Sequence, residues 1–166
     1  MILAREEANP GNLRPAHESQ EIFCLFEGEW ELDRVIQGVG VFKGSSVFKL
    51  VAPGILRYSE EGELKLETGF QGSACKEYFY QLANDHLVVS FADALPGARP
   101  FLRLYPQGDS DQFWAKDVHH CGSDSYECTY AFAGRDAFTT AISVKGAAKN
   151  YSMRSRFARR ASSVSL

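Results

Sequence analysis

Metal-binding and nucleophilic side chains crowd one short stretch, residues 117–130, which reads DVHHCGSDSYECTY. A structural Zn²⁺ site needs four ligands, which usually come as two pairs that are each close in sequence. His119 and Cys121 form one such pair, but Cys24 and Cys75 each stand alone. The spacing therefore disfavours a zinc site, and neither a metal nor another cofactor is expected.

A cysteine nucleophile in this stretch is disfavoured as well. Imidazoles beside Cys121 can lower the pKa of its thiol, but the sequence offers no oxyanion-binding glycine loop and no helix to hold one. The stretch is more typical of a β-hairpin, in which residues 122–124 form the turn and Cys128 is a small buried apolar side chain. His119 and Asp124 at the hairpin are the candidates for an acid–base pair.

Arg34 is the other side chain whose position suggests chemistry. It shares one face of an alternating stretch with Trp30 and Leu32, so strict alternation would bury it. A buried guanidinium without a partner is very unfavourable, so Arg34 must stack on an aromatic ring or bind carboxylates or carbonyls.

The elements that carry these residues are predicted to be strands. Apolar side chains recur at every second residue, and turn residues such as 52–54 and 60–62 break the pattern. Helical signals are limited to one turn, Ser19–Phe26, with Ser19 as its N-cap. About nine or ten short strands joined in sequence predict an all-β, antiparallel up-and-down barrel, because closure removes the exposed sheet edges.

The composition describes one folded domain. The chain has 166 residues, of which 45% are hydrophobic and 13% aromatic. A net charge of −3 disfavours nucleic acid as a main partner, and no apolar run approaches the ~20 residues that span a bilayer. Residues 1–20 lack the pattern of a secretory signal, which favours reduced cysteines and an intracellular location, in the cytoplasm or an organelle matrix.

An ordered series of short motifs runs through residues 25–158. It consists of Gly28-Glu29-Trp30 with Arg34, then Phe42-Lys43-Gly44, Tyr58-Ser59-Glu60-Glu61-Gly62, and His119-His120-Cys121-Gly122-Ser123-Asp124-Ser125-Tyr126. This series resembles a lipocalin-like family of unknown function in the calycin superfamily, whose members open with Gly-x-Trp and carry His-x-Cys-x-x-Asp-x-Tyr late in the chain. The resemblance implies a lipocalin-like barrel with a short N-terminal helical turn, and almost nothing about activity.

The end of the chain departs from the family pattern, which closes on Lys-Asp-Tyr. Ile142 stands where an aromatic residue is expected, Ala147 where proline is expected, and Asn150 where aspartate is expected. If that aspartate binds a ligand in relatives, this chain has lost the role. The expected organisation is an N-terminal extension (1–20), a barrel domain (21–158) and a flexible C-terminal tail (159–166).

The resemblance leaves two roles open for Arg34. In one, Arg34 closes the base of the barrel by stacking near Trp30, as an arginine does in many lipocalin-like barrels. In the other, it points into the cavity and holds an anionic head group. The candidate ligand-binding residues are Trp30, Arg34, Phe48, Tyr78, Tyr80, Phe91, His119, Asp124, Tyr126 and Tyr130.

Three functions are compatible with the sequence. The first is non-catalytic binding of a small hydrophobic or amphipathic ligand, including an anionic one, inside the barrel. The second is an accessory or structural subunit of a larger assembly, for instance a mitochondrial one, with a barrel filled by its own side chains and terminal tails that contact other subunits. The third is an enzyme that uses the His119–Asp124 pair.

Overall fold

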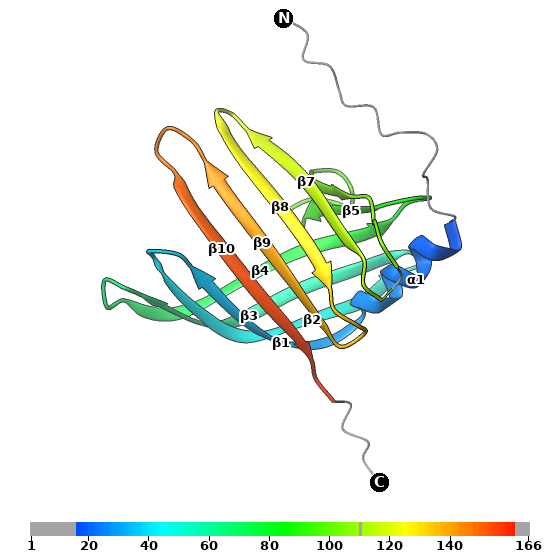
Figure 1. The fold of residues 1–166 in the computed structure, drawn as a ribbon, viewed down its shortest axis with the longest axis horizontal. Coiled ribbons are helices and arrows are strands. Elements are labelled where there is room, and N and C mark those ends of the chain that lie inside the picture. Colours follow the sequence, from blue (N-terminus) through cyan, green and yellow to red (C-terminus); the bar gives the residue numbers. More distant parts are fainter. Residues whose placement is uncertain (1–15, 110, 162–166) are drawn as a thin grey trace, which may run out of the picture.

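The chain folds as a nearly closed, up-and-down barrel of ten antiparallel strands with one N-terminal helix, as a computed structural model of residues 16–109 and 111–161 shows (Figure 1). The elements are α1 (Ala16–Phe26), β1 (Gly28–Ile36), β2 (Gly40–Ala52), β3 (Ile55–Leu66), β4 (Gln71–Leu82), β5 (Leu87–Phe91), β6 (Pro100–Leu104), β7 (Trp114–Cys121), β8 (Asp124–Phe132), β9 (Ala137–Lys145) and β10 (Asn150–Arg159). The predicted fold class is confirmed. Most of the predicted extension and tail lies outside the described residues.

The sheet order is β6-β5-β4-β3-β2-β1-β10-β9-β8-β7. Neighbours in this order follow one another in the chain, except that β1 pairs with β10 and so joins the two halves of the sheet. β6 and β7 are the two edges, and they lie side by side across a seam. A hydrogen bond of 2.7 Å from the Arg103 backbone N–H to Asp117 Oδ2 joins the edges there. Gln107, in the segment between β6 and β7, forms a bridge with Trp114 at the start of β7.

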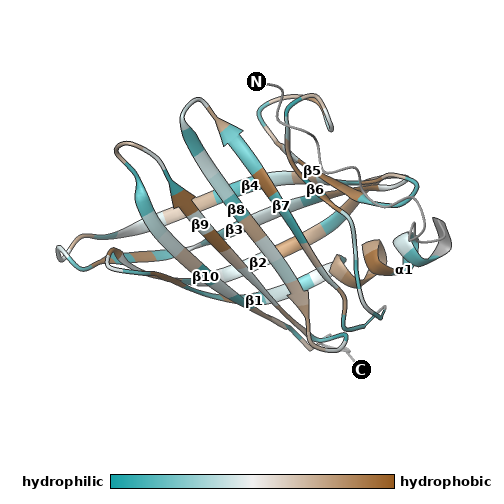
Figure 2. Ribbon diagram, turned by 45° about the horizontal axis from the view of Figure 1, so that its top comes forward, coloured by the Kyte–Doolittle hydropathy of each residue, from teal (hydrophilic) through white to brown (hydrophobic). Residues whose placement is uncertain are grey.

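Helix α1 closes one end of the barrel (Figures 1 and 2). Ile22 and Phe26 on its apolar face are fully buried, and the Phe26 carbonyl accepts a hydrogen bond of 2.9 Å from Trp30 Nε1. The helix is longer than the single turn predicted from the sequence. It begins at Ala16, so Ser19 lies inside the helix and is buried, and the predicted N-cap role for Ser19 is wrong.

Arg159 at the end of β10 fastens the barrel wall to this helix. Its guanidinium lies 4.2 Å from the centroid of the Trp30 ring and donates hydrogen bonds to the carbonyls of Leu25 (2.6 Å) and Glu27 (2.8 Å). These carbonyls lie at the C-terminal end of α1, where a positive charge is favourable. Stacking near Trp30, one of the two roles considered for Arg34, is therefore made by Arg159.

Strand β3 runs without interruption through the turn that the sequence predicts at residues 60–62. Gly62 pairs with Gly44 on β2, and a Cβ atom at Gly44 would lie 2.1 Å from the Glu61 carbonyl oxygen. The two glycines thus allow a close approach of two long strands rather than a turn. The consequence for the site is that Glu60 sits in the middle of a strand and faces the interior. Among the described residues, no helix is long and apolar enough to cross a membrane.

Candidate ligand site at the barrel mouth

A small cavity lies inside the barrel and is lined from several strands. Its volume is about 40 Å³. Ligand pockets for drug-sized molecules have volumes of roughly 300–1,000 Å³, so this cavity accommodates only a water molecule or two or the head group of a ligand. The lining side chains are Arg34, Tyr58, Glu60, Lys76, Tyr78, Tyr80, Val89, Phe101, Tyr130, Thr140, Ile142, Met153 and Phe157.

An ion pair between Arg34 and Glu60 forms part of the cavity wall. The guanidinium donates two parallel hydrogen bonds to the carboxylate, at 2.7 Å and 2.9 Å, and a third from Nε to Ser155 Oγ at 2.7 Å. The Tyr58 hydroxyl donates to the same carboxylate, and the Phe42 ring lies 5.4 Å from the guanidinium carbon. Arg34 therefore has a carboxylate partner within the fold, and its charge is neutralised.

The electrostatics keep this pair ionised. Burial would raise the pKa of Glu60, but the hydrogen bonds and charge of Arg34 and the bond from Tyr58 outweigh burial and hold that pKa below its usual value. Burial likewise disfavours the charged form of Arg34, but the Glu60 carboxylate outweighs it and raises the pKa of Arg34. Burial and the adjacent negative charge raise the pKa of Tyr58 well above its usual value, so Tyr58 is a neutral donor.

Lys76 adds a second cation to the same cavity. Lys76 lies at the open edge of the cavity, where its side chain is exposed to solvent. Partial desolvation by the neighbouring lining residues, and then the positive charge of Arg34, lower the pKa of Lys76, while Glu60 opposes this shift. In the part of the chain that the structure describes, Lys76 has no carboxylate of its own, because Glu60 is held by Arg34. Two cations and one anion leave the cavity with one net positive charge.

Tyrosine hydroxyls form the remaining polar surface of the cavity. Tyr80 and Tyr130 are buried and share a hydrogen bond of 2.7 Å between their hydroxyl oxygens. Burial raises the pKa of Tyr78 to about 12, so its hydroxyl is also neutral. The adjacent Cys128 is fully buried, and burial raises the pKa of its thiol to about 12, which makes it an inert thiol rather than a nucleophile.

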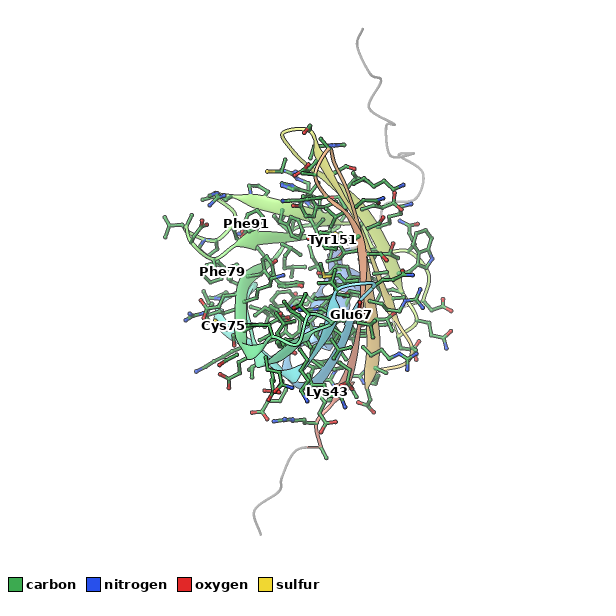
Figure 3. All side chains as sticks on the ribbon, turned by 90° about the vertical axis from the view of Figure 1, so that its left-hand side faces the viewer. Lys43, Glu67, Cys75, Phe79, Phe91 and Tyr151 are labelled. Carbon is green, nitrogen blue, oxygen red and sulfur yellow. The ribbon has the colours of Figure 1, made fainter. Side chains whose placement is uncertain are left out.

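Aromatic rings line one side of the mouth, which is the end of the barrel that α1 does not close. Each of five consecutive strands contributes one ring. They are Tyr78, Phe91, Phe101, His119 and Tyr126, and we call them the aromatic arc. Neighbouring rings along the arc have centroid distances between 5.0 Å (Phe101–His119) and 6.1 Å (His119–Tyr126). All five side chains are partly exposed. Figure 3 looks into this end of the barrel, with Phe91 on the β5 side and Tyr151 on the β10 side.

The predicted acid–base pair is not assembled at the rim. His119 faces the rings of Phe91 and Phe101, whereas the Asp124 carboxylate lies 3.5 Å from Lys149 Nζ. Lys149 also donates to the Tyr126 hydroxyl at 3.2 Å. Among the described residues, no three histidine, cysteine, aspartate or glutamate side chains come together as metal ligands.

The structure divides the sequence-predicted site residues into three groups. Arg34, Tyr78, Tyr80 and Tyr130 line the cavity. The mouth holds Phe91, His119, Asp124 and Tyr126. The packed core near α1 holds Trp30 and Phe48, which do not line the cavity. The Phe138 ring packs against both, the Phe26 ring packs against Phe48, and Trp30 donates a hydrogen bond to the Phe26 carbonyl.

Sequence reasoning missed Tyr58, Glu60, Lys76 and Phe101. The signal for Glu60 was its position two residues after Tyr58, because both side chains face inward if the strand continues past residue 60. The turn-like residues Glu60-Glu61-Gly62 obscured that signal. Lys76 was missed because a lysine in an alternating strand is usually on the solvated face.

Two larger hollows lie on the outer surface, each of about 780 Å³. One lies over β2, β3 and β4 and includes Lys43, Glu61 and Cys75; the other lies over β1, β8, β9 and β10 and includes Arg154 and Arg156. Both are lined mainly by side chains of the outer strand faces, and the second also includes Ile142 and Met153, which line the interior cavity as well. The smaller interior cavity, in contrast, holds buried charges and neutral tyrosines, which is typical of a functional site.

Comparisons with known proteins match this architecture. The structure is similar to the crystal structure of Rv2717c from M. tuberculosis, with a TM-score of 0.55 and 13% sequence identity, covering 90% of this chain and 100% of that chain. It is also similar to EF1p2_mFAP2b bound to DFHBI (TM-score 0.49, 12% identity, 86% of this chain and 99% of that chain). A de novo designed fluorescence-activating β-barrel matches with a TM-score of 0.46 and 10% identity over 84% of this chain and 98% of that chain. A comparison with curated protein sequences gives no match.

The model of one protein family matches residues 26–159, which include all ten strands. The chain therefore belongs to DUF6314, a family of unknown function.

Proposed function

We propose that the barrel binds a small amphipathic ligand at its open end, without catalysis, as lipocalin-like barrels of the calycin superfamily do. The anionic head group of the ligand enters the cavity beside Lys76, and its apolar body rests on the side chains of the mouth. The observation that carries this proposal is the charge of the cavity: Arg34 is neutralised by Glu60, whereas Lys76 is a cation without a carboxylate partner among the described residues.

The energetic cost of this arrangement supports a binding role. Desolvation, and then the nearby charge of Arg34, lower the pKa of Lys76, which means that the folded protein disfavours the charge on Lys76. Charges that the fold disfavours in this way occur preferentially at functional sites. An anionic head group would remove this cost by pairing with Lys76.

The size of the cavity restricts how the ligand binds. At about 40 Å³ it has no room for a whole fatty chain or a cofactor. The helix end of the barrel is filled by the side chains of Phe26, Trp30 and Phe138. Only the head group is therefore enclosed, and the body of the ligand lies at the mouth.

Lys76→Met tests the proposal. The probe is 1-anilinonaphthalene-8-sulfonate, a fluorescent amphipathic anion, titrated against the wild-type protein and the variant. Because a charge-assisted hydrogen bond contributes about 1.5–3 kcal/mol, the variant should bind at least about tenfold more weakly. Lys49→Met, which removes an exposed lysine on the outside of β2, should leave the dissociation constant unchanged. Equal affinity of the wild type and Lys76→Met would refute the proposal.

A subunit role is the second candidate, and exposed apolar residues on β7 favour it. Trp114 is 49% exposed and Val118 is 40% exposed on the outer face of this edge strand. Edge strands and exposed apolar surface are common sites of protein association. Native mass spectrometry of protein purified from its own source would show a stoichiometric partner that a Trp114→Ser variant loses. A monomer with a bound small molecule would exclude the subunit role.

An enzyme is the weakest candidate, because Asp124 pairs with Lys149 and not with His119. His119→Ala should leave any measured turnover unchanged.

A further inference from the structure

We infer that the ligand is a planar aromatic anion, such as an aromatic carboxylate or sulfonate. This inference rests on the proposed function and names its ligand class. It is carried by the aromatic arc, in which five partly exposed rings from β4, β5, β6, β7 and β8 surround one side of the mouth.

The geometry of the arc suits a flat ligand. Tyr78 and Phe101 stack with an angle of 12° between their planes and 5.8 Å between centroids. The His119 ring meets Phe101 edge-on at 5.0 Å. Aromatic rings associate favourably at centroid distances of 4.5–7 Å in stacked or edge-to-face arrangements, so a further ring can continue the pattern that these side chains already form.

An aliphatic surface continues the cavity wall beyond the arc. Ile142 and Met153 line the cavity from β9 and β10, the two strands that follow β8 in the sheet order. Neither is aromatic, and the unbranched methionine side chain adapts its shape to the surface that it contacts. Rings have only two side-chain torsions, so the arc loses little conformational entropy when a ligand binds. A rigid aromatic face together with an adaptable aliphatic surface in the same cavity favours a planar body over a flexible chain.

The charges restrict the ligand further. The net positive charge that Lys76 leaves in the cavity disfavours a cationic ligand, such as the quaternary ammonium compounds that aromatic cages often bind. The cavity admits a carboxylate or sulfonate beside Lys76, while a ring attached to that group would remain among Phe101, Tyr78 and Ile142.

A matched pair of ligands tests the class. 2-Naphthoate and decahydronaphthalene-2-carboxylate have the same skeleton and charge, but only the first is aromatic. We expect 2-naphthoate to bind about tenfold more tightly in calorimetric titrations, although the saturated compound is the more hydrophobic of the two. This tenfold preference corresponds to about 1.4 kcal/mol.

Variants assign the preference to the arc. Phe101→Leu should abolish the preference while leaving the affinity for the saturated compound within about twofold. His119→Leu, on another strand, serves the same purpose if Phe101→Leu does not fold. Phe70→Leu, which changes a ring that is 58% exposed outside the arc, should leave the preference intact.

The other outcomes separate the two claims. If the saturated compound binds as tightly as 2-naphthoate or more tightly, and Lys76→Met weakens that binding, the aromatic ligand class is wrong and the proposed function stands. Binding of neither compound, or binding that Lys76→Met does not change, would overturn both.

Discussion

Two arginines show how a residue's environment, and not its type, decides its role. Arg34 lies on β1 and faces the barrel interior, and Arg159 lies on β10, the strand that pairs with β1, and faces the base of the barrel. Arg159 stacks on Trp30 and binds carbonyls at the end of α1, so it is structural. Arg34 binds Glu60 in the cavity wall, where its charge also lowers the pKa of Lys76.

Glu60→Gln tests the stability that this buried pair provides. Glutamine has the shape of a protonated glutamate, so the variant should be less stable than the wild type by about 2–4 kcal/mol at pH 7. The pKa of Glu60 is lowered in the folded protein. Its contribution is therefore present above the unfolded pKa of about 4.3 and is lost as the pH falls through the folded pKa. The difference in unfolding free energy between the two proteins, measured with urea, should shrink towards zero below about pH 4.

Glu77→Gln is the matched control for this prediction. Glu77 also accepts a hydrogen bond of 2.7 Å from an arginine, Arg57, but both side chains are about half exposed. Exposed pairs of this kind contribute about 0–1 kcal/mol. Glu77→Gln should therefore differ little from the wild type at any pH, and a gap for Glu60→Gln that stayed constant down to pH 3 would contradict the assignment.

The sequence predicts single side chains of the site better than their partners. Alternation correctly placed Arg34 on an inward face, because a strand has a fixed period of two. Its partner Glu60 is 26 residues away along the chain and lies in a stretch with turn-like composition. No local pattern reports such a pairing, since it depends on the register between strands that are not adjacent. The same reason explains why Arg159, and not Arg34, was found on Trp30.

At the level of elements, the sequence predicts where most strands lie but not how long they are. β3 continues through Glu60-Glu61-Gly62 because Gly62 faces Gly44 in the register of β2 and β3. A turn and a close cross-strand approach both require glycine, so the residue type alone does not distinguish them. The distinction matters for the site, since a turn at this position would remove Glu60 from the barrel interior.

Gly44→Ala tests this close approach. The added Cβ would lie 2.1 Å from the Glu61 carbonyl oxygen and 2.7 Å from the Gly62 Cα. These are backbone atoms, so the two strands must move apart, and we expect a loss of about 1–3 kcal/mol in the unfolding free energy. Ser45→Ala at the next position should change stability by less than about 0.5 kcal/mol. Thermal unfolding followed by circular dichroism gives both values, and equal midpoints for the two variants would rule out the steric argument.

Arg159→Met tests the attachment of β10 to α1. Methionine keeps some contact with Trp30 but leaves the carbonyls of Leu25 and Glu27 without their charged donor. The bond to Leu25 is partly buried and the bond to Glu27 is exposed. Since hydrogen bonds to charged groups contribute about 1.5–3 kcal/mol and less when water can replace them, the free energy of unfolding should fall by about 1–2 kcal/mol. Arg156→Met, on the solvated face of the same strand, is the control and should have little effect. A similar loss in both variants would argue against the special role of Arg159.

On the scale of the whole molecule, the barrel is packed unevenly. The end near α1 is filled by stacked and edge-on aromatic rings, for example Phe132 and Phe138 at 4.7 Å. The mouth has partly exposed rings and a net positive cavity. The strength of strand pairing around the barrel is uneven too. Few hydrogen bonds join β6 and β7 at the seam, whereas the other neighbouring strands pair in backbone ladders, with register shifts in the β2–β3 and β5–β6 ladders.

The seam predicts where the barrel opens first. Backbone amides of β6 and β7 that face the seam have no partner strand, so they should exchange hydrogen with solvent at least about tenfold faster than amides of β2 and β3, which are paired on both sides. Asp117→Ala removes the carboxylate that accepts the Arg103 amide and should speed exchange in β6 and β7 further, without affecting the β1–β10 ladder. Asp33→Ala, which removes an exposed carboxylate on β1, should leave the exchange pattern unchanged. Mass-spectrometric measurement of peptides from each strand distinguishes these cases, and uniform protection around the barrel would show that the seam is as stable as a backbone ladder.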